Sequence, residues 1–87
     1  MEDLSAAAAR NLGAKLRSLR HGRGLSLADA SDEADVSLPY LSEIERGEKL
    51  PSLTVLLQIA ASYGLTVAEL LADVPPFGGA VEPGGER

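Results

Sequence analysis

The chain has 87 residues, of which 45% are hydrophobic, and it carries a formal net charge of −5 at pH 7. A chain of this length forms one small domain, and the absence of cysteine excludes a disulfide framework and thiolate metal sites. It contains no apolar run near the ~20 residues that span a bilayer and no leader of basic and then apolar residues. We therefore expect a cytoplasmic protein that does not enter a membrane.

The first predicted helix covers about residues 4–21. Its alanine-rich beginning has a high helix propensity, and Leu12, Leu16 and Leu19 form an apolar stripe at helical spacing. Glycines follow directly and end this helix.

Two short helices are predicted next. Ser26 is a favourable N-cap for the first, and Asp29 three residues later fits a capping box. Ser37 caps the other after a short turn, and Gly47 ends it in a left-handed conformation. Two short helices joined by a tight turn are a helix-turn-helix arrangement, but a plain helical bundle fits the same spacing equally well.

A fourth and a fifth helix complete the predicted all-α fold, and no segment has a strand pattern. The fourth begins after Pro51 and Ser52 and has leucines and an alanine on one face, while residues 66–69 form a capping box for a short fifth helix. Prolines and glycines dominate residues 74–87, which predicts a flexible tail. We thus divide the chain into an alanine-rich helical extension (1–11), a helix-turn-helix domain (12–73) and this tail.

The charge distribution bears on nucleic-acid binding more than the net charge does. A net negative charge disfavours contacts with phosphates, yet five of the eight basic residues lie within residues 10–23. Residues 26–45 carry six acids and no Lys or Arg, and Arg46 and Lys49 follow directly. The third predicted helix is therefore acidic where a DNA-reading helix is expected to be basic.

Nothing in the sequence indicates catalysis. There is one histidine, His21, no G-x-S-x-G motif and no pair of acids in an apolar setting, while Ser26, Ser37 and Ser52 lie where helix caps are needed. His21 is placed to interact with the end of the first helix rather than with a metal. We expect neither an enzyme nor a bound cofactor or metal.

Residues 12–71 resemble the lambda-repressor-like helix-turn-helix regulators of bacteria and phages. The resemblance is carried by LRSLR, GLSLAD, VSLPYLSEIERGEKLPSL and LLQIAASYGLTVAELL, in family order and spacing. The phrase PYLSEIERG, followed by PSL, is also similar to the DNA-damage-response repressors of that family. The resemblance implies a compact five-helix domain whose third helix enters the major groove of double-stranded DNA, with two copies on an inverted repeat.

The resemblance also implies roles for individual residues. Base contacts would come from Leu38, Pro39, Ser42 and Glu43. Phosphate contacts would come from the start of the second helix, the loop after the third helix and the start of the fourth, namely Ser26, Leu27, Arg46, Lys49 and Ser52. Arg20 would form a structural ion pair with Glu45 and hold the first helix against the third. Within the basic cluster of the first helix, Arg17 and Arg23 are the better candidates for phosphate contacts, and a solvated face is the alternative.

Several positions depart from the family pattern. Leu38 and Pro39 can touch thymine methyl groups but cannot hydrogen-bond to base edges. Glu43 can accept from a cytosine amino group or simply belong to a solvated helix face. Asp35 occupies a turn position that is usually glycine, and Ala30 occupies one that is usually leucine.

Taken together, the sequence predicts a sequence-specific DNA-binding transcriptional regulator, in the form of a repressor that binds an inverted repeat as a homodimer. Apolar residues left over near the end of the domain are the candidates for the dimer interface: Val67, Leu70, Leu71 and Val74. The alternative is a protein-interaction module on the same fold, an antitoxin or anti-repressor that binds a protein partner through its acidic face. A DNA-binding half that lacks its effector domain is a third possibility.

Overall fold

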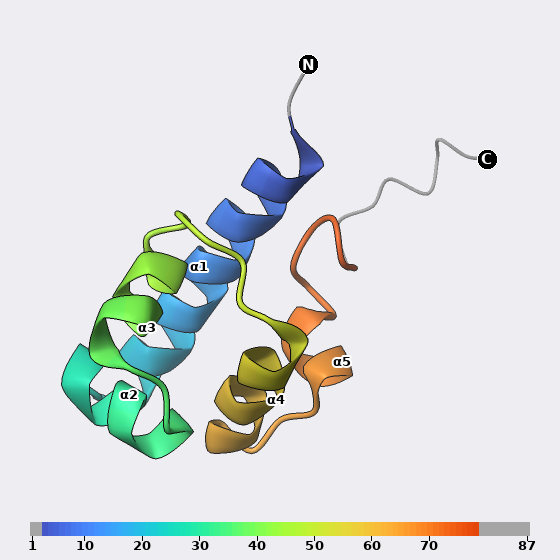
Figure 1. Cartoon of the computed structure of the whole chain (residues 1–87). Helices are drawn as coiled ribbons and strands as arrows, with labels where there is room; N and C mark the ends of the chain where they lie inside the picture. Colours follow the sequence, from blue (N-terminus) through green and yellow to red (C-terminus); the bar gives the residue numbers. More distant parts are fainter. Residues whose placement is uncertain (1–2, 79–87) are drawn as a thin grey trace.

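The computed structural model describes residues 3–78 and contains no strand within them. Five helices follow one another along the chain (Figure 1): α1 (Leu4–Gly22), α2 (Leu27–Ala34), α3 (Leu38–Glu45), α4 (Leu53–Ser62) and α5 (Val67–Leu71). The predicted all-α, five-helix class is confirmed. None of these helices is both long and apolar enough to cross a membrane.

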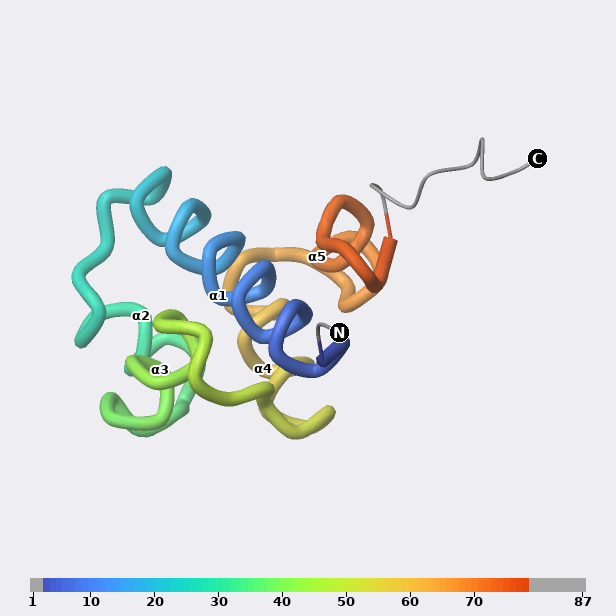
Figure 2. Tube along the Cα trace, turned by 90° about the horizontal axis from the view of Figure 1, so that it is seen from above, coloured from blue at the N-terminus to red at the C-terminus, as the bar shows by residue number. Residues whose placement is uncertain are grey.

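The long helix α1 organises the other four. Viewed from above, α1 lies between the α2–α3 pair and α5, and α4 lies below it (Figure 2). The helix pairs that contact each other most are α1 with α3, α2 with both α3 and α4, and α4 with α5. Every helix except α2 contributes one or more large, fully buried side chains, and so does the turn after α5: Leu12, Leu16, Ile44, Ile59, Leu70 and Val74. From α2 the core receives the small residues Ala30, Ser31 and Ala34.

Four helices begin at caps that the sequence predicts. The side chains of Ser26, Ser37, Ser52 and Thr66 each accept a hydrogen bond from the backbone N–H three residues later. These bonds satisfy donors that a helix N-terminus leaves without an intrahelical partner. At the other end of α2, the Gln58 amide donates to the carbonyls of Ala34 and Asp35, both at 3.1 Å. This second kind of cap joins α4 to the turn between α2 and α3.

The turn between α2 and α3 places Asp35 in the left-handed region, with φ of 57°. A side chain in this conformation costs energy, and the carboxylate also lies at the negative end of the α2 dipole. Asp35→Gly should therefore raise the free energy of unfolding by about 1 kcal/mol. Urea denaturation monitored by circular dichroism measures this gain. Asp32→Gly, inside α2, is the control and should lower stability by a similar amount.

Two of the predicted domain boundaries need correction. Val74 falls within the predicted flexible tail, but this residue is 2% exposed and belongs to the core. The Asn11 amide donates to the Pro75 carbonyl at 2.8 Å, which fixes the segment after α5 against α1. Residues 79–87 of that tail, and Met1 and Glu2, lie outside the described residues. The boundary after residue 11 also falls inside α1, which runs unbroken past it.

Candidate nucleic-acid interface

Helix α3 turns one face inward and one outward. Leu41, Ile44 and Glu45 are buried, and because they recur at helical spacing the opposite face must point to solvent. That outward face carries the four residues predicted to contact bases, Leu38, Pro39, Ser42 and Glu43, and we call it the reading face. Leu38 is 44% exposed. The reading face is therefore apolar at its start and polar one turn later.

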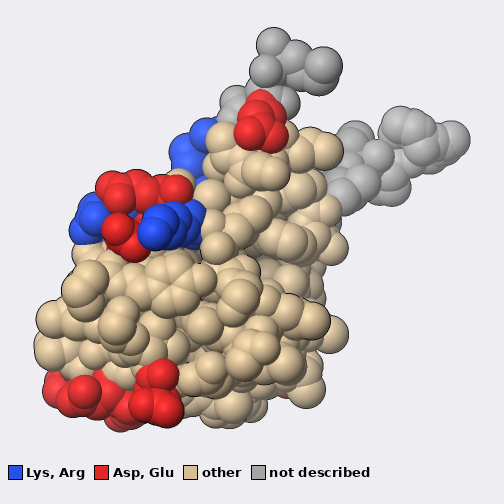
Figure 3. Space-filling view, viewed as in Figure 1, with Lys and Arg blue, Asp and Glu red and all other residues tan. Residues whose placement is uncertain are grey.

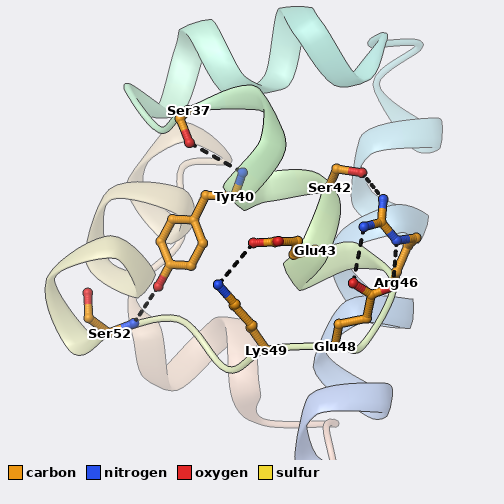
Figure 4. Close-up of polar contacts among 8 residues, drawn as sticks. All are labelled: Ser37, Tyr40, Ser42, Glu43, Arg46, Glu48, Lys49 and Ser52. Atoms are coloured by element: carbon orange, nitrogen blue, oxygen red, sulfur yellow. Dashed lines mark hydrogen bonds and ion pairs between the residues drawn. The ribbon is translucent and has the colours of Figure 1, made fainter.

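Arg46 is the first residue after α3, and its side chain contacts one residue before it in the sequence and one after it (Figure 4). Its Nε lies 2.8 Å from Glu48 Oε2, its Nη2 lies 3.1 Å from Glu48 Oε1, and its Nη1 donates to the Ser42 hydroxyl. The hydrogen bonds with Glu48 raise the pKa of Arg46 and lower the pKa of Glu48. Gly47, with φ of 76°, makes the sharp turn that brings the Glu48 carboxylate back to Arg46.

Lys49 and Tyr40 connect the end of α3 to the start of α4. Lys49 Nζ lies 3.2 Å from Glu43 Oε1 and 5.9 Å from the centre of the Tyr40 ring. The Tyr40 hydroxyl accepts a hydrogen bond from the Ser52 backbone N–H at 3.2 Å. Figure 4 shows these side chains close together, with one contact between Glu43 and Lys49 and a separate one between Tyr40 and Ser52. Sequence reasoning missed the contact of Tyr40 with Ser52, which joins two helices.

The buried pair between α1 and α3 is the structural ion pair that the sequence predicts. Arg20 Nε donates to both Glu45 carboxylate oxygens at 3.0 Å, and Arg20 Nη1 donates to the Leu25 carbonyl at 3.1 Å. The hydrogen bond with Glu45 raises the pKa of Arg20. The Glu45 side chain is only 2% exposed, so this acid contributes little to the charge on the surface of α3.

The predicted phosphate-contacting residues do not all lie together. Arg46 and Lys49 follow the end of α3, and Ser52 contacts Tyr40 in the first turn of that helix. Arg17 shares with Arg46 an open hollow of about 460 Å³ between α1 and α3. Arg23 lies elsewhere, because it donates to the Tyr63 carbonyl at the C-terminal end of α4, about 15 Å from the Ser52 end. Ser26 and Leu27 form the N-terminus of α2, where Ser26 caps the helix and Leu27 packs against the core.

The residues predicted for a dimer interface are corrected in part. Leu70 is 0% exposed and Val74 is 2% exposed, so both serve the core of the single chain and cannot present a surface to a partner. Val67 and Leu71 are partly buried against the same core. The large apolar side chains exposed on a helix close by are Leu53 and Leu57 of α4, at 68% and 54%.

Charge is sparse on the face seen in Figure 3. Acidic and basic side chains gather at the upper left, an acidic group lies at the lower left, and the area between them is uncharged. The sequence explains part of this pattern, because residues 50–68 contain no charged side chain. The face that carries α3 is therefore not strongly positive.

Comparisons with known proteins identify relatives. The family described as helix-turn-helix domain matches residues 11–72. The chain is 48% identical over 64 residues to the HTH-type transcriptional regulator DdrOP3 of Deinococcus deserti, covering 74% of this chain and 50% of the relative. It is 45% identical over 62 residues to the transcriptional regulator ClgR of Mycobacterium tuberculosis, covering 71% and 55%. The chain thus spans about half the length of these curated relatives.

A solved structure supports the same assignment. The clp gene regulator ClgR of Corynebacterium glutamicum superimposes with a TM-score of 0.69 at 38% identity, covering 76% of this chain and 70% of that one. The predicted lambda-repressor-like fold is confirmed by this similarity.

Proposed function

We propose, because the chain belongs to the helix-turn-helix domain family, that it binds double-stranded DNA as a sequence-specific transcriptional regulator. The observation that carries the proposal is the reading face of α3, which is held outward by the buried face and is bordered by Arg46, Lys49 and the N-terminus of α4. A two-turn helix fits the major groove, and cations together with a helix N-terminus suit the phosphates beside it. This function implies a cytoplasmic location.

Each part of this surface has a different role in the proposal. Leu38 and Pro39 would touch thymine methyl groups, and the Ser42 hydroxyl would hydrogen-bond to a base edge. Arg46 and Lys49 would hold phosphates, as would the N-termini of α2 and α4 at Ser26, Leu27 and Ser52. Arg17, which is half exposed, would reach the backbone from the α1 side.

We further propose that the regulator acts as a repressor and that two copies bind an inverted repeat. The burial of Leu70 and Val74 moves the expected interface to the exposed leucines of α4, with Val67 and Leu71 at its margin. A two-fold interface brings identical surfaces together, so an uncharged helix avoids the repulsion that this acidic chain would otherwise meet.

Selection of bound sequences from random DNA duplexes tests the proposal. We expect enrichment of an inverted repeat whose half-sites lie one helical turn apart, about 10 base pairs. The double variant Arg46→Ala with Lys49→Ala should enrich nothing, because its phosphate contacts are lost. An unenriched pool from the native chain at low salt would refute DNA binding.

A protein-interaction module, an antitoxin or anti-repressor, is the second candidate. It is favoured by the pairing of Arg46 and Lys49 with acids of the same chain and by the exposed acids of α2. The two functions differ in their salt dependence. DNA affinity should fall with a slope of about −0.9 per phosphate contact in a log–log plot, whereas an acidic protein-binding surface should retain no DNA at low salt.

A further inference from the structure

Each of the two cations beside the reading face is paired with a carboxylate in the free protein. The Arg46 guanidinium donates to both carboxylate oxygens of Glu48, and the Lys49 ammonium forms an ion pair with the Glu43 carboxylate. The Arg46 arrangement resembles the way in which a phosphate would bind, because a guanidinium takes two oxygens of a carboxylate or a phosphate in the same geometry. The Lys49 ammonium contacts one carboxylate oxygen, as it would contact one phosphate oxygen. A DNA phosphate that approaches either cation therefore meets an anion that is already bound there.

The Arg46–Glu48 and Lys49–Glu43 pairs are much more exposed to solvent than the Arg20–Glu45 pair inside the protein. The side chains of Arg46 and Glu48 are 49% and 55% exposed, and those of Lys49 and Glu43 are 56% and 34% exposed. Arg20 and Glu45, in contrast, are 13% and 2% exposed. Exposed ion pairs are weak because water and salt compete with them, so the two outer pairs can open when a stronger anion arrives, whereas the inner pair stays closed.

We propose that Glu48 and Glu43 are affinity-setting residues that occupy, in the free protein, the places of two DNA phosphates on Arg46 and Lys49. DNA binding is then an exchange of carboxylate for phosphate on the same two cations. This inference rests on the proposed DNA-binding function and assigns Glu43 a role other than reading a base.

The exchange has a consequence for the reading face. Ser42 accepts from Arg46 Nη1 in the free protein, whereas Glu48 occupies Nε and Nη2, so a phosphate that replaces Glu48 leaves the hydrogen bond to Ser42 in place. Contact with the backbone would in this way keep Ser42 oriented by the same arginine that binds the phosphate. Arg46 is a positioning residue for Ser42 as well as a phosphate ligand.

A double-mutant cycle tests the exchange, with a short double-stranded DNA of random sequence as the probe and fluorescence anisotropy at low salt as the readout. Glu48→Gln together with Glu43→Gln should bind DNA about three- to tenfold more tightly, since two weak internal pairs no longer compete. In an Arg46→Ala background the gain from Glu48→Gln alone should shrink to less than twofold, because the masked cation is absent.

A matched control separates this effect from a general change in charge. Asp32→Asn with Glu33→Gln on α2 gives the same net charge as the double Gln variant, and neither acid forms an ion pair within residues 3–78. This control should gain less than twofold. Circular dichroism should show that all variants retain the native helix content.

Two contrary outcomes have different meanings. If the native chain binds DNA and the double Gln variant gains no more than the control, or if Glu48→Gln alone keeps its gain without Arg46, the exchange is wrong and the DNA-binding function stands. If neither the native chain nor the double Gln variant binds DNA at low salt, the proposed function and the exchange both fail.

Discussion

Gly13→Ala should destabilise the domain by about 3 kcal/mol, at the upper end of the usual cost of overpacking. Gly13 is buried in α1, and a Cβ atom there would lie 2.6 Å from the carbonyl oxygens of both Ile44 and Glu45. These atoms belong to the backbone at the end of α3, so they cannot turn away as a flexible side chain could. The helices would have to separate, which would break the packing that holds the reading face outward. Urea denaturation measures the loss.

Gly22→Ala at the other end of α1 is the control for this substitution. Apart from its chain neighbours and the backbone of its own helix, no heavy atom in the described part of the chain lies within 4 Å of the new Cβ position. The change should therefore raise stability by about 0.5–1 kcal/mol, since alanine favours the helix and glycine does not. If Gly13→Ala stays within 1 kcal/mol of the native chain, the close approach of α1 and α3 is refuted.

Glu45→Ala should cost about 3 kcal/mol of unfolding free energy, because it leaves the charge of a largely buried arginine without its ionic partner. Arg20 would keep its hydrogen bond to the Leu25 carbonyl, which compensates only in part. The thermal midpoint and the urea midpoint should both fall. Glu48→Ala is the matched control, since Glu48 also binds an arginine at 2.8 Å but both partners are exposed, and it should change neither midpoint appreciably.

The combination with Arg20→Ala checks the physical cause of this loss. Removing both charges should cost less than the sum of the two single substitutions, because no unpaired ion then remains in the interior. Additive losses would show that the two side chains stabilise the protein independently and would contradict the pairing.

The sequence predicts those features that depend on neighbours along the chain. Ser26, Ser37 and Ser52 cap helices because a short hydroxyl meets a backbone N–H three residues away, whatever the rest of the fold does. Gly47 ends α3 for a similarly local reason. The pairing of Arg20 with Glu45 is long-range, and only the family resemblance predicts it.

Features that depend on distant segments were missed or misplaced. Nothing beside Gly13 in the sequence reveals that two carbonyls of α3 lie against it. Val74 precedes a run of proline and glycine and was assigned to the tail, although the core has a place for it beside α5. The contacts of Tyr40 with Ser52 and of Gln58 with the end of α2 also arise only when α4 packs against the helix-turn-helix.

The attachment of the segment after α5 to α1 determines where the chain leaves the domain. Asn11 holds the Pro75 carbonyl against α1, and the backbone then turns so that the Gly78 N–H donates to the Val74 carbonyl beside the end of α5. Figure 1 shows this exit on the side of the molecule away from α2 and the start of α3. A fluorescent protein or an immobilisation linker that follows Gly78 would therefore leave room for a long duplex to lie across α3, whereas a bulky insertion in the turn at Asp35 would block it.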